Sequence, residues 1–260
     1  MKQNTDRFDL NGKVAAVVGG SGVLGGGMAR TLAAAGAGVA IFYSGNQEGA
    51  EEHKEAIEKM GGEAMICRAD ARDEQELKKA FHLVKEKWGG IDVLVNAPGV
   101  NSVTPVMEIT EEEWDRIMDI NLKGVFFSSR IVAEMMIEQG RPGSIINISS
   151  ASSEIPLSKV FTYSISKAGI NNMTKFLARE WAPHNIRVNA ILPGFFPAEQ
   201  NRKILTKERT EAIFNHTPMH RFGETDELSG ALLWLASEKA SSFVTGAVVP
   251  VDGGFTAMTI

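Results

Sequence analysis

The chain has 260 residues, with 27 lysines and arginines against 32 aspartates and glutamates, a net charge of −5 and a pI near 5.6. This length suits one large domain or two small ones with a buried core. The acidic balance argues against nucleic acid and anionic membranes as partners, since both favour basic surfaces. The single cysteine, Cys67, excludes an internal disulfide and a cysteine-rich zinc site.

The amino-terminal segment gives no sign of targeting. Residues 1–12 are polar, and no apolar run anywhere in the chain reaches about 18 residues. We therefore expect a cytosolic protein that does not contact a membrane. The five histidines show no metal-ligand spacing with carboxylates, so we also expect no metal site.

Short apolar runs alternate with helical patterns along the whole chain. The apolar runs are 14–18, 39–43, 64–67, 91–95, 144–148, 187–192 and 247–251. The helical patterns are 28–35, 47–60, 73–88, 111–138, 163–182 and 227–235. This order predicts an α/β protein with a doubly wound Rossmann fold, in which about seven parallel strands are flanked by helices. No proline-rich linker, charge block or repeat marks a boundary, so residues 1–260 are interpreted as a single domain.

One segment interrupts the alternation. Residues 193–218 begin with Pro-Gly, continue with two phenylalanines and then become polar and weakly helical. A long irregular insertion in an α/β domain is more often functional than neutral. We therefore predict a substrate loop there.

A glycine-rich segment follows the first apolar run. Gly20, Gly22 and Gly25 match the G-x-G-x-x-G spacing between a predicted strand and a predicted helix. Glycines in that place allow a diphosphate to approach the backbone and meet the helix amino terminus. The residues expected to hold the cofactor here are Gly19, Ser21, Gly22, Val23, Leu24 and Gly25.

The end of the second predicted strand bears on the choice of cofactor. The acid that holds the ribose hydroxyls of NAD is missing, since Tyr43 and Ser44 end the run and the first acid is Glu48. We expect Tyr43 and Ser44 to border the ribose and predict NADP or NAD, with a mild preference for NADP. No arginine stands in the glycine loop or at 43–46 to bind a 2′-phosphate.

Tyr163 and Lys167 stand four residues apart at the head of a predicted helix. That spacing puts both side chains on one face, one turn apart. An ammonium beside a phenol favours the phenolate, so we expect a Tyr163 pKa below the ordinary ~10. The pair then serves as a proton donor or acceptor near neutral pH.

With these two motifs in place, the chain resembles the short-chain dehydrogenase/reductase family from about residue 10 to residue 255. Further matching pieces are Asp70, Asn96-Ala97-Pro98-Gly99, Asn121 in Ile-Asn-Leu-Lys-Gly, Ile148-Ser149-Ser150, Ile186-Arg187-Val188-Asn189, Pro193-Gly194 and Val251-Asp252-Gly253-Gly254. The sequence departs from the family at Val18, at Val23 and at Ala97-Pro98, where a threonine, a glycine and Asn-Ala are usual.

The resemblance implies the remaining site residues. Catalysis would use Asn121, Ser150, Tyr163 and Lys167, with Ser150 orienting the substrate carbonyl and Asn121 holding a water that passes protons to Lys167. Ser149 is the neighbour that could be confused with Ser150. Cofactor contacts would further include Asp70, Ala71, Asn96, Ala97, Tyr163, Lys167, Pro193 and Gly194.

The carboxyl-terminal half is also similar to a subgroup that acts on sugar acids, of the D-mannonate oxidoreductase (fructuronate reductase) type. Its pieces include Pro156-Leu157-Ser158-Lys159, Glu199-Gln200-Asn201-Arg202 and His216-Thr217-Pro218-Met219. A sugar acid needs a cation for its carboxylate, which Lys159 or Arg202 could provide. The expected substrate contacts are therefore Ser150, Lys159, Tyr163 and Arg202.

These observations predict an NAD(P)-dependent oxidoreductase that interconverts a secondary alcohol and a ketone, on a uronate or aldonate such as fructuronate, mannonate or gluconate. Two alternatives stay open. One is a 3-oxoacyl thioester reductase of the acyl-carrier-protein type, and the other is a cofactor-binding regulator without turnover. The family resemblance further implies a homotetramer in which the helices predicted at 111–138 and 163–182 pack across an interface.

Overall fold

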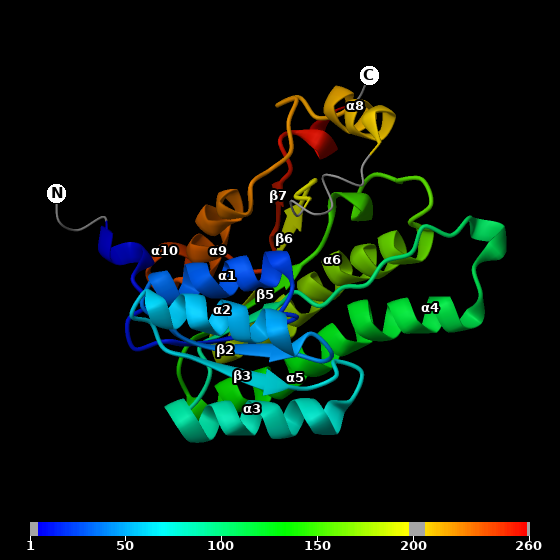
Figure 1. Ribbon diagram of the computed structural model, residues 1–260. Helices are drawn as coiled ribbons and strands as arrows, with labels where there is room; N and C mark the ends of the chain where they lie inside the picture. Colours follow the sequence, from blue (N-terminus) through cyan, green and yellow to red (C-terminus); the bar gives the residue numbers. More distant parts are fainter. Residues whose placement is uncertain (1–4, 198–205, 259–260) are drawn as a thin grey trace.

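The computed structural model describes residues 5–197 and 206–258, which form one α/β domain around a seven-stranded sheet (Figure 1). The strands are β1 (Val14–Val18), β2 (Gly38–Tyr43), β3 (Ala64–Arg68), β4 (Val93–Asn96), β5 (Gly143–Ile148), β6 (Ile186–Pro193) and β7 (Val248–Val251). All neighbours pair in parallel, in the order β3-β2-β1-β4-β5-β6-β7. The predicted Rossmann fold of seven parallel strands is confirmed.

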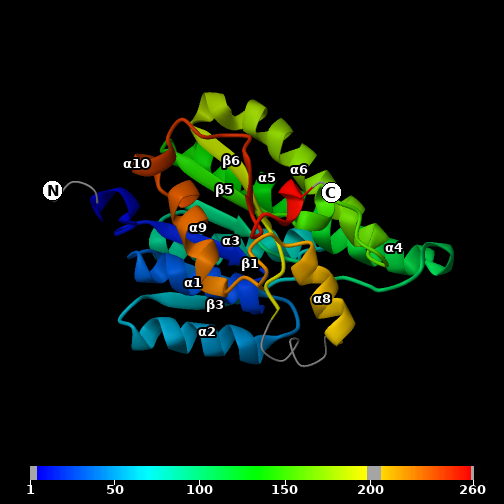
Figure 2. The same cartoon turned by 90° about the horizontal axis from the view of Figure 1, so that it is seen from above.

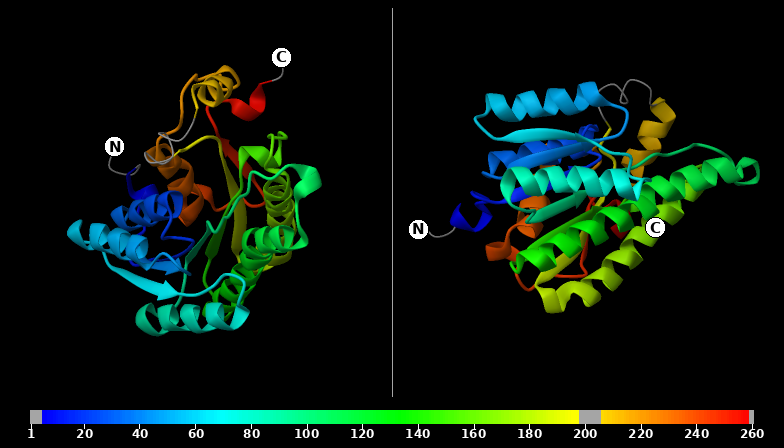
Figure 3. Two further views of the ribbon diagram at one scale, coloured as in Figure 1. Left: turned by 45° about the vertical axis from the view of Figure 1, so that its right-hand side comes forward. Right: turned by 90° about the horizontal axis from the view of Figure 1, so that it is seen from below.

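Helices cover both faces of the sheet. The helices are α1 (Val23–Ala34), α2 (Gln47–Lys59), α3 (Glu74–Trp88), α4 (Glu111–Met118), α5 (Gly124–Gln139), α6 (Phe161–Trp181), α8 (Lys207–Asn215), α9 (Ser229–Ala236) and α10 (Glu238–Ser241). Helices α1, α2 and α9 pack on one face, while α3, α5 and α6 pack on the other (Figure 3). Helix α8 lies apart from both layers, beyond the carboxyl ends of β6 and β7 (Figures 1 and 2).

The two-sided cover explains why a central strand such as β1, with the sequence VAAVV, is apolar throughout. Successive side chains of a strand point to opposite faces. Val17 therefore belongs to the hydrophobic core under α1 and α2, whereas Val18 belongs to the core under α3 and α5. Both side chains are buried, so no polar position is available in β1.

Two helices differ from the sequence prediction. Helix α1 begins at Val23, five residues before the predicted start at 28, because the glycine-rich stretch is itself helical. The single helix predicted for 111–138 is α4 followed by α5, joined by one π-helical segment, Asp119–Lys123. Such segments occur frequently at functional sites. This one contains Asn121.

No helix within the described ranges is long and apolar enough to cross a membrane. The tetramer stays a prediction. The helices that would form it leave apolar side chains in solvent, among them Phe161 (43% exposed) and Phe176 (58% exposed) on α6.

Candidate active site

The glycine-rich loop lies against the end of β4, at the edge of the sheet where all strands end. Strand β1 pairs with β4 so that Val18 is opposite Asn96, and Ala97 N donates a 2.9 Å hydrogen bond to Val18 O. Gly19 follows in the left-handed region with φ +76°, and a Cβ there would come within 2.6 Å of Ala97 O. Only glycine satisfies both conditions. Chain order reverses between β1 and β4, which is where open α/β sheets bind ligands.

The first turn of α1 is open to an anion. Its N-cap residue, Gly22, has no side chain to bond the first backbone N–H groups, and no acid stands in that turn. A Cβ at Gly22 would meet only Gly19 O, at 3.6 Å, so the space above it is free. Asn46 steadies the loop because its Nδ2 donates to Ser21 O at 3.1 Å. This geometry fits the diphosphate of a dinucleotide.

The ends of β2 and β3 border the adjoining part of this edge. The Tyr43 side chain is 8% exposed and packs in the core under α1 and α2, so only its backbone is available to a ligand, whereas Ser44 is exposed. Strand pairing sets Arg68 directly beside Tyr43. Arg68 is exposed, and no described residue pairs with its guanidinium. Arg68 was not predicted, because strand register brings it to this edge from outside the glycine loop and segment 43–46, where a cation was expected.

Two further predicted cofactor residues have engaged side chains. Asn96 is fully buried, where its Oδ1 accepts from Ser128 at 2.6 Å and its Nδ2 donates to Ser129 and Asn147, each at 2.9 Å. Both polar atoms of the Asn96 side chain are therefore used within the protein, and neither is available to a ligand. Asp70 accepts from Arg72 Nη2 at 2.6 Å, and this hydrogen bond lowers the pKa of the Asp70 carboxyl. Ala71 is buried beside Gly124.

Tyr163 and Lys167 lie near the amino end of α6, as their spacing predicted. The Lys167 ammonium is 5.7 Å from the centroid of the Tyr163 ring. Lys167 is 3% exposed, and its Nζ donates to Ile148 O at the end of β5 at 2.8 Å. Burial lowers the Lys167 pKa to about 8.

The expected fall in the Tyr163 pKa is wrong for the protein as the structure describes it. Burial raises the pKa of Tyr163, and a hydrogen bond to the Ser150 side chain opposes this rise only in part. Desolvation therefore outweighs the neighbouring charge at this phenol.

The two adjacent serines after β5 have different surroundings. Ser149 is buried, and its hydroxyl donates to Lys167 O at 3.2 Å and to Ser153 Oγ at 3.3 Å. Ser150 is only partly buried, and its hydroxyl bonds the Tyr163 side chain and accepts from Ser152 N at 3.2 Å. Ser150 is thus the serine whose oxygen faces Tyr163.

Asn121 connects α4 and α5 to this cluster. It is fully buried, with Oδ1 accepting from Val100 N at 2.9 Å and Nδ2 donating to Val100 O at 2.9 Å and Ser166 Oγ at 3.1 Å. A Cβ placed on Gly99 would lie 3.8 Å from Lys167 Nζ and 4.0 Å from Asn121 Oδ1. The structure thus gathers Asn121, Ser150, Tyr163 and Lys167 at one place.

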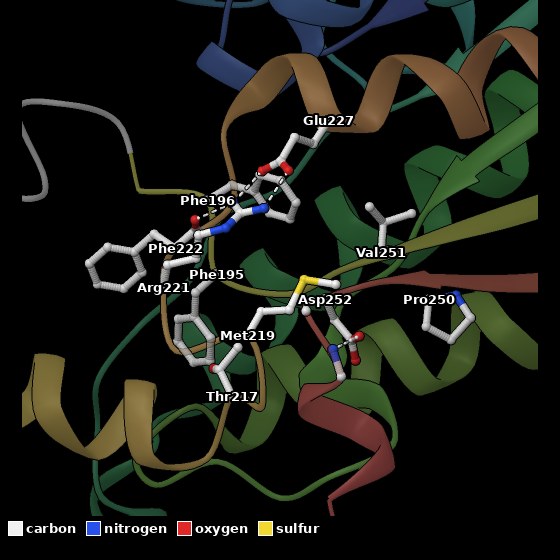
Figure 4. A pocket seen from close by; sticks show the side chains of 13 residues that line it. Phe195, Phe196, Thr217, Met219, Arg221, Phe222, Glu227, Pro250, Val251 and Asp252 are labelled. Atoms are coloured by element: carbon white, nitrogen blue, oxygen red, sulfur yellow. Dashed lines mark hydrogen bonds and ion pairs between the residues drawn. The ribbon is translucent and has the colours of Figure 1, made fainter.

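Pro193 is the last residue of β6, and Gly194 follows it beside the carboxyl-terminal turn. Gly194 N donates to Val251 O at 3.0 Å, and any Cβ on Gly194 would overlap the backbone of Asp252. A cavity of about 340 Å³ lies beyond this contact, between segment 195–196, loop 217–227 and turn 250–254 (Figure 4). Two charged side chains in its wall pair with each other. Arg221 donates two 2.6 Å hydrogen bonds to Glu227 and lowers the pKa of the Glu227 carboxyl to about 2.

The two cations predicted for the substrate carboxylate have different outcomes. Arg202 lies outside the described residues. Lys159 is exposed in the loop between Ser150 and Tyr163, with φ +63°. Within the described ranges no group of three or more histidine, cysteine or carboxylate residues could hold a metal ion.

Comparison with known proteins identifies the family. Residues 20–256 match the family model described as enoyl-(acyl carrier protein) reductase. An uncharacterized oxidoreductase, UxuB, of Bacillus subtilis (strain 168) is 39% identical over 96% of each chain. The 3beta-hydroxysteroid dehydrogenase 1 of Eggerthella lenta is also 39% identical, over 95% of each chain.

A solved structure agrees closely with this fold. It is a gluconate 5-dehydrogenase of Burkholderia cenocepacia J2315 in complex with NADP and tartrate, with a TM-score of 0.92, 34% identity, and coverage of 98% of this chain and 99% of that one. Matches of this extent, together with the glycine loop and the Tyr163–Lys167 cluster, show that this chain is an oxidoreductase of the short-chain dehydrogenase/reductase family.

Proposed function

We propose that the protein interconverts a secondary alcohol and a ketone on a sugar acid, with NADP or NAD as cofactor. The observation that carries this proposal is the meeting of Ser150, Tyr163, Lys167 and Asn121 at the same sheet edge as the open first turn of α1. Diphosphate binding and proton transfer are thereby brought together, as a reaction between a dinucleotide and an alcohol requires.

The side chains of this site have distinct parts in the proposed reaction. Ser150 Oγ hydrogen-bonds the substrate oxygen, and Tyr163 donates a proton to that oxygen during reduction or removes one during oxidation. Lys167 places a positive charge by the Tyr163 ring, which favours the phenolate during turnover. Asn121 holds the turn at Val100 and orders a water that passes protons to Lys167. The cofactor supplies or accepts the hydride when bound.

The dinucleotide would be held along the glycine loop and the strand ends. The loop residues Gly19 to Gly25 and the first turn of α1 would hold the diphosphate. Asp70 and Ala71 would border the adenine, and Ala97, Pro193 and Gly194 would border the nicotinamide half together with Tyr163 and Lys167.

A sugar acid is favoured as substrate by the gluconate 5-dehydrogenase, which shares 34% of its residues and nearly the whole fold with this chain. The mannonate or fructuronate subgroup stays a finer form of the same proposal, with Lys159 or Arg202 as its cation. The steroid-dehydrogenase relative points instead to an apolar alcohol, and an acyl thioester is the third candidate.

Substrate profiling tests this proposal. Turnover of 5-keto-D-gluconate, fructuronate, a 3-ketosteroid and acetoacetyl-CoA would be measured with NADPH and with NADH. We expect the highest kcat/KM on one of the two acids. The highest value on the steroid or the thioester would contradict the sugar-acid proposal, and no turnover of any substrate would favour a regulator.

Replacement of Tyr163 tests the proposed proton transfer. Tyr163→Phe should lower kcat by at least ~10²-fold, the usual scale for a general acid or base, because the ring stays and only the hydroxyl is lost. Cofactor affinity, measured by quenching of protein fluorescence, should change little. A variant with near-normal turnover would remove Tyr163 from the mechanism.

Burial of Lys167 makes a prediction about pH and stability. Its pKa is about 8 in the folded protein against an ordinary 10.5, so between these values the unfolded chain binds the extra proton and stability rises with pH. The free energy of unfolding of the wild type minus that of Lys167→Met should therefore rise from pH 8 to 10.5, by at most about 1.4 kcal/mol per pH unit. Below pH 8 the difference should be constant.

Urea unfolding without cofactor would measure that difference. Burial raises the Cys67 pKa to about 11, which acts in the opposite direction, but both proteins retain Cys67 and its effect cancels. A difference that does not change with pH would mean that Lys167 stays protonated throughout the range.

The exposed Arg68 beside Tyr43 gives the NADP preference a residue to test. If its guanidinium binds the 2′-phosphate, Arg68→Ala should lower kcat/KM with NADPH by roughly ten-fold and leave the value with NADH unchanged. Lys59→Ala, at an exposed position of α2, is the charge-matched control. Equal losses with the two cofactors, or no loss, would refute this role.

A further inference from the structure

A second cavity lies between α8 and the loop that follows Ser150. Its volume is about 290 Å³, close to the lower end of the range for small-molecule sites, roughly 300–1,000 Å³. Leu157 and Ser158 line one side, α8 lines the other, and Phe195 and Phe255 line it between them. Most of this lining is apolar. Its few polar side chains therefore determine which ligands it can accept.

The cavity is lined in part by the segment that links the two catalytic residues Ser150 and Tyr163. Leu157 and Ser158 belong to the segment that runs from Ser150 to Tyr163. Phe195 and Phe255 pack edge to face, with centroids 5.2 Å apart, in a small core that includes Ala151, the residue after Ser150. The cavity and the catalytic serine are therefore linked by this small core and by the segment that follows Ser150.

Arg209 of α8 lines this cavity with an unused charge. Its only side-chain contact within the described ranges is a 3.4 Å hydrogen bond from Nη1 to Ser158 Oγ, which is longer than usual. Other arginines of the chain, such as Arg72 and Arg221, hold carboxylates at 2.6 Å. A guanidinium without an acid partner, beside an apolar cavity, is suited to an anionic ligand.

His216, just after α8, gives an independent sign of a ligand. Its Nε2 is buried and has no hydrogen-bond partner among residues 5–197 and 206–258, while its ring packs edge-on against Phe255 with centroids 4.6 Å apart. His216 also lines the cavity. Buried polar atoms without partners are uncommon in native proteins, because each loses its bonds to water without replacement. A substrate hydroxyl could supply the missing bond.

We propose that Arg209, assisted by Ser158, binds the carboxylate of the acid substrate, and that His216 Nε2 bonds a hydroxyl of its carbon chain. The inference rests on the proposed function and names the residues that select an acid. In a 5-keto-hexonate the carboxylate lies four carbons from the reacting carbon, so its binding group must stand away from Ser150. Arg209 meets that condition in the cavity wall. Lys159, although adjacent to Ser158, does not line the cavity.

Kinetics on a matched pair of substrates test the role of Arg209. The acid is 5-keto-D-gluconate and the neutral ketose of equal carbon number is L-sorbose. Arg209→Ala should lower kcat/KM on the acid by roughly ten- to a hundred-fold, mainly through KM, and on the ketose by less than about three-fold. Arg209→Lys should recover part of the loss, since it keeps the charge without the two-pronged geometry. Lys207→Ala, on the same helix and exposed, is the control.

His216→Phe tests the hydroxyl contact separately, because phenylalanine preserves the packing on Phe255. We expect a loss of about ten-fold on both the acid and the ketose, with unchanged cofactor affinity. If Nε2 instead bonds a structural water, His216→Phe will lower the melting temperature and leave KM unchanged, which overturns the His216 assignment.

The failures can be distinguished. Normal turnover of the acid by Arg209→Ala would overturn the present inference and leave the proposed function intact. A wild type that reduces no sugar acid would overturn both. Equal losses by Arg209→Ala on the acid and the ketose would show a structural role for Arg209 and refute charge recognition.

Discussion

The pairing of β1 with β4 is the constraint on which the site depends. Once Val18 lies opposite Asn96, the glycine loop must pass against Ala97, and only the missing Cβ of Gly19 allows that approach. The same pairing joins the two halves of the sheet. Because β5 and β6 run parallel to β4, the residues that follow β5 and the end of β6 at Pro193 reach the same edge. The buried amides of Asn96 and Asn147 join adjacent strands and fix this arrangement from within.

A buried ammonium is the energetic cost of this arrangement. Lys167 is almost fully enclosed, its ammonium donates a hydrogen bond to Ile148 O, and burial lowers its pKa to about 8. Tyr163 is held neutral by the same desolvation. Without ligand, Tyr163 is therefore a neutral phenol that can donate a proton. This desolvation cost is tolerated because the sheet and α6 determine the positions of both side chains.

The proposed groups for substrate recognition and for the chemistry come from different parts of the fold. The proposed catalytic side chains come from the sheet edge and the head of α6, whereas Arg209 and His216 come from α8 and the turn after it. Loops and short helices outside the sheet tolerate sequence change better than strands do. Such a division would let one fold serve different substrates, as the names of the steroid dehydrogenase and the gluconate 5-dehydrogenase among its relatives indicate.

Features that depend on local geometry could be predicted from the amino-acid sequence. Runs of apolar residues gave the strands, and a four-residue spacing placed Tyr163 and Lys167 on one helix face, because helix periodicity is fixed by the backbone. The glycine spacing likewise located the loop before α1.

The positions of residues that are distant in sequence depend on how the strands and helices pack, and the sequence pattern does not show them. Strand register set Arg68 beside Tyr43, buried the Tyr43 side chain and turned Asn96 inward. Folding of α8 over the Ser150 loop brought Arg209 to Ser158. The direction of the Tyr163 pKa shift also needed the structure, because desolvation depends on everything packed around a group and not on its neighbours in sequence.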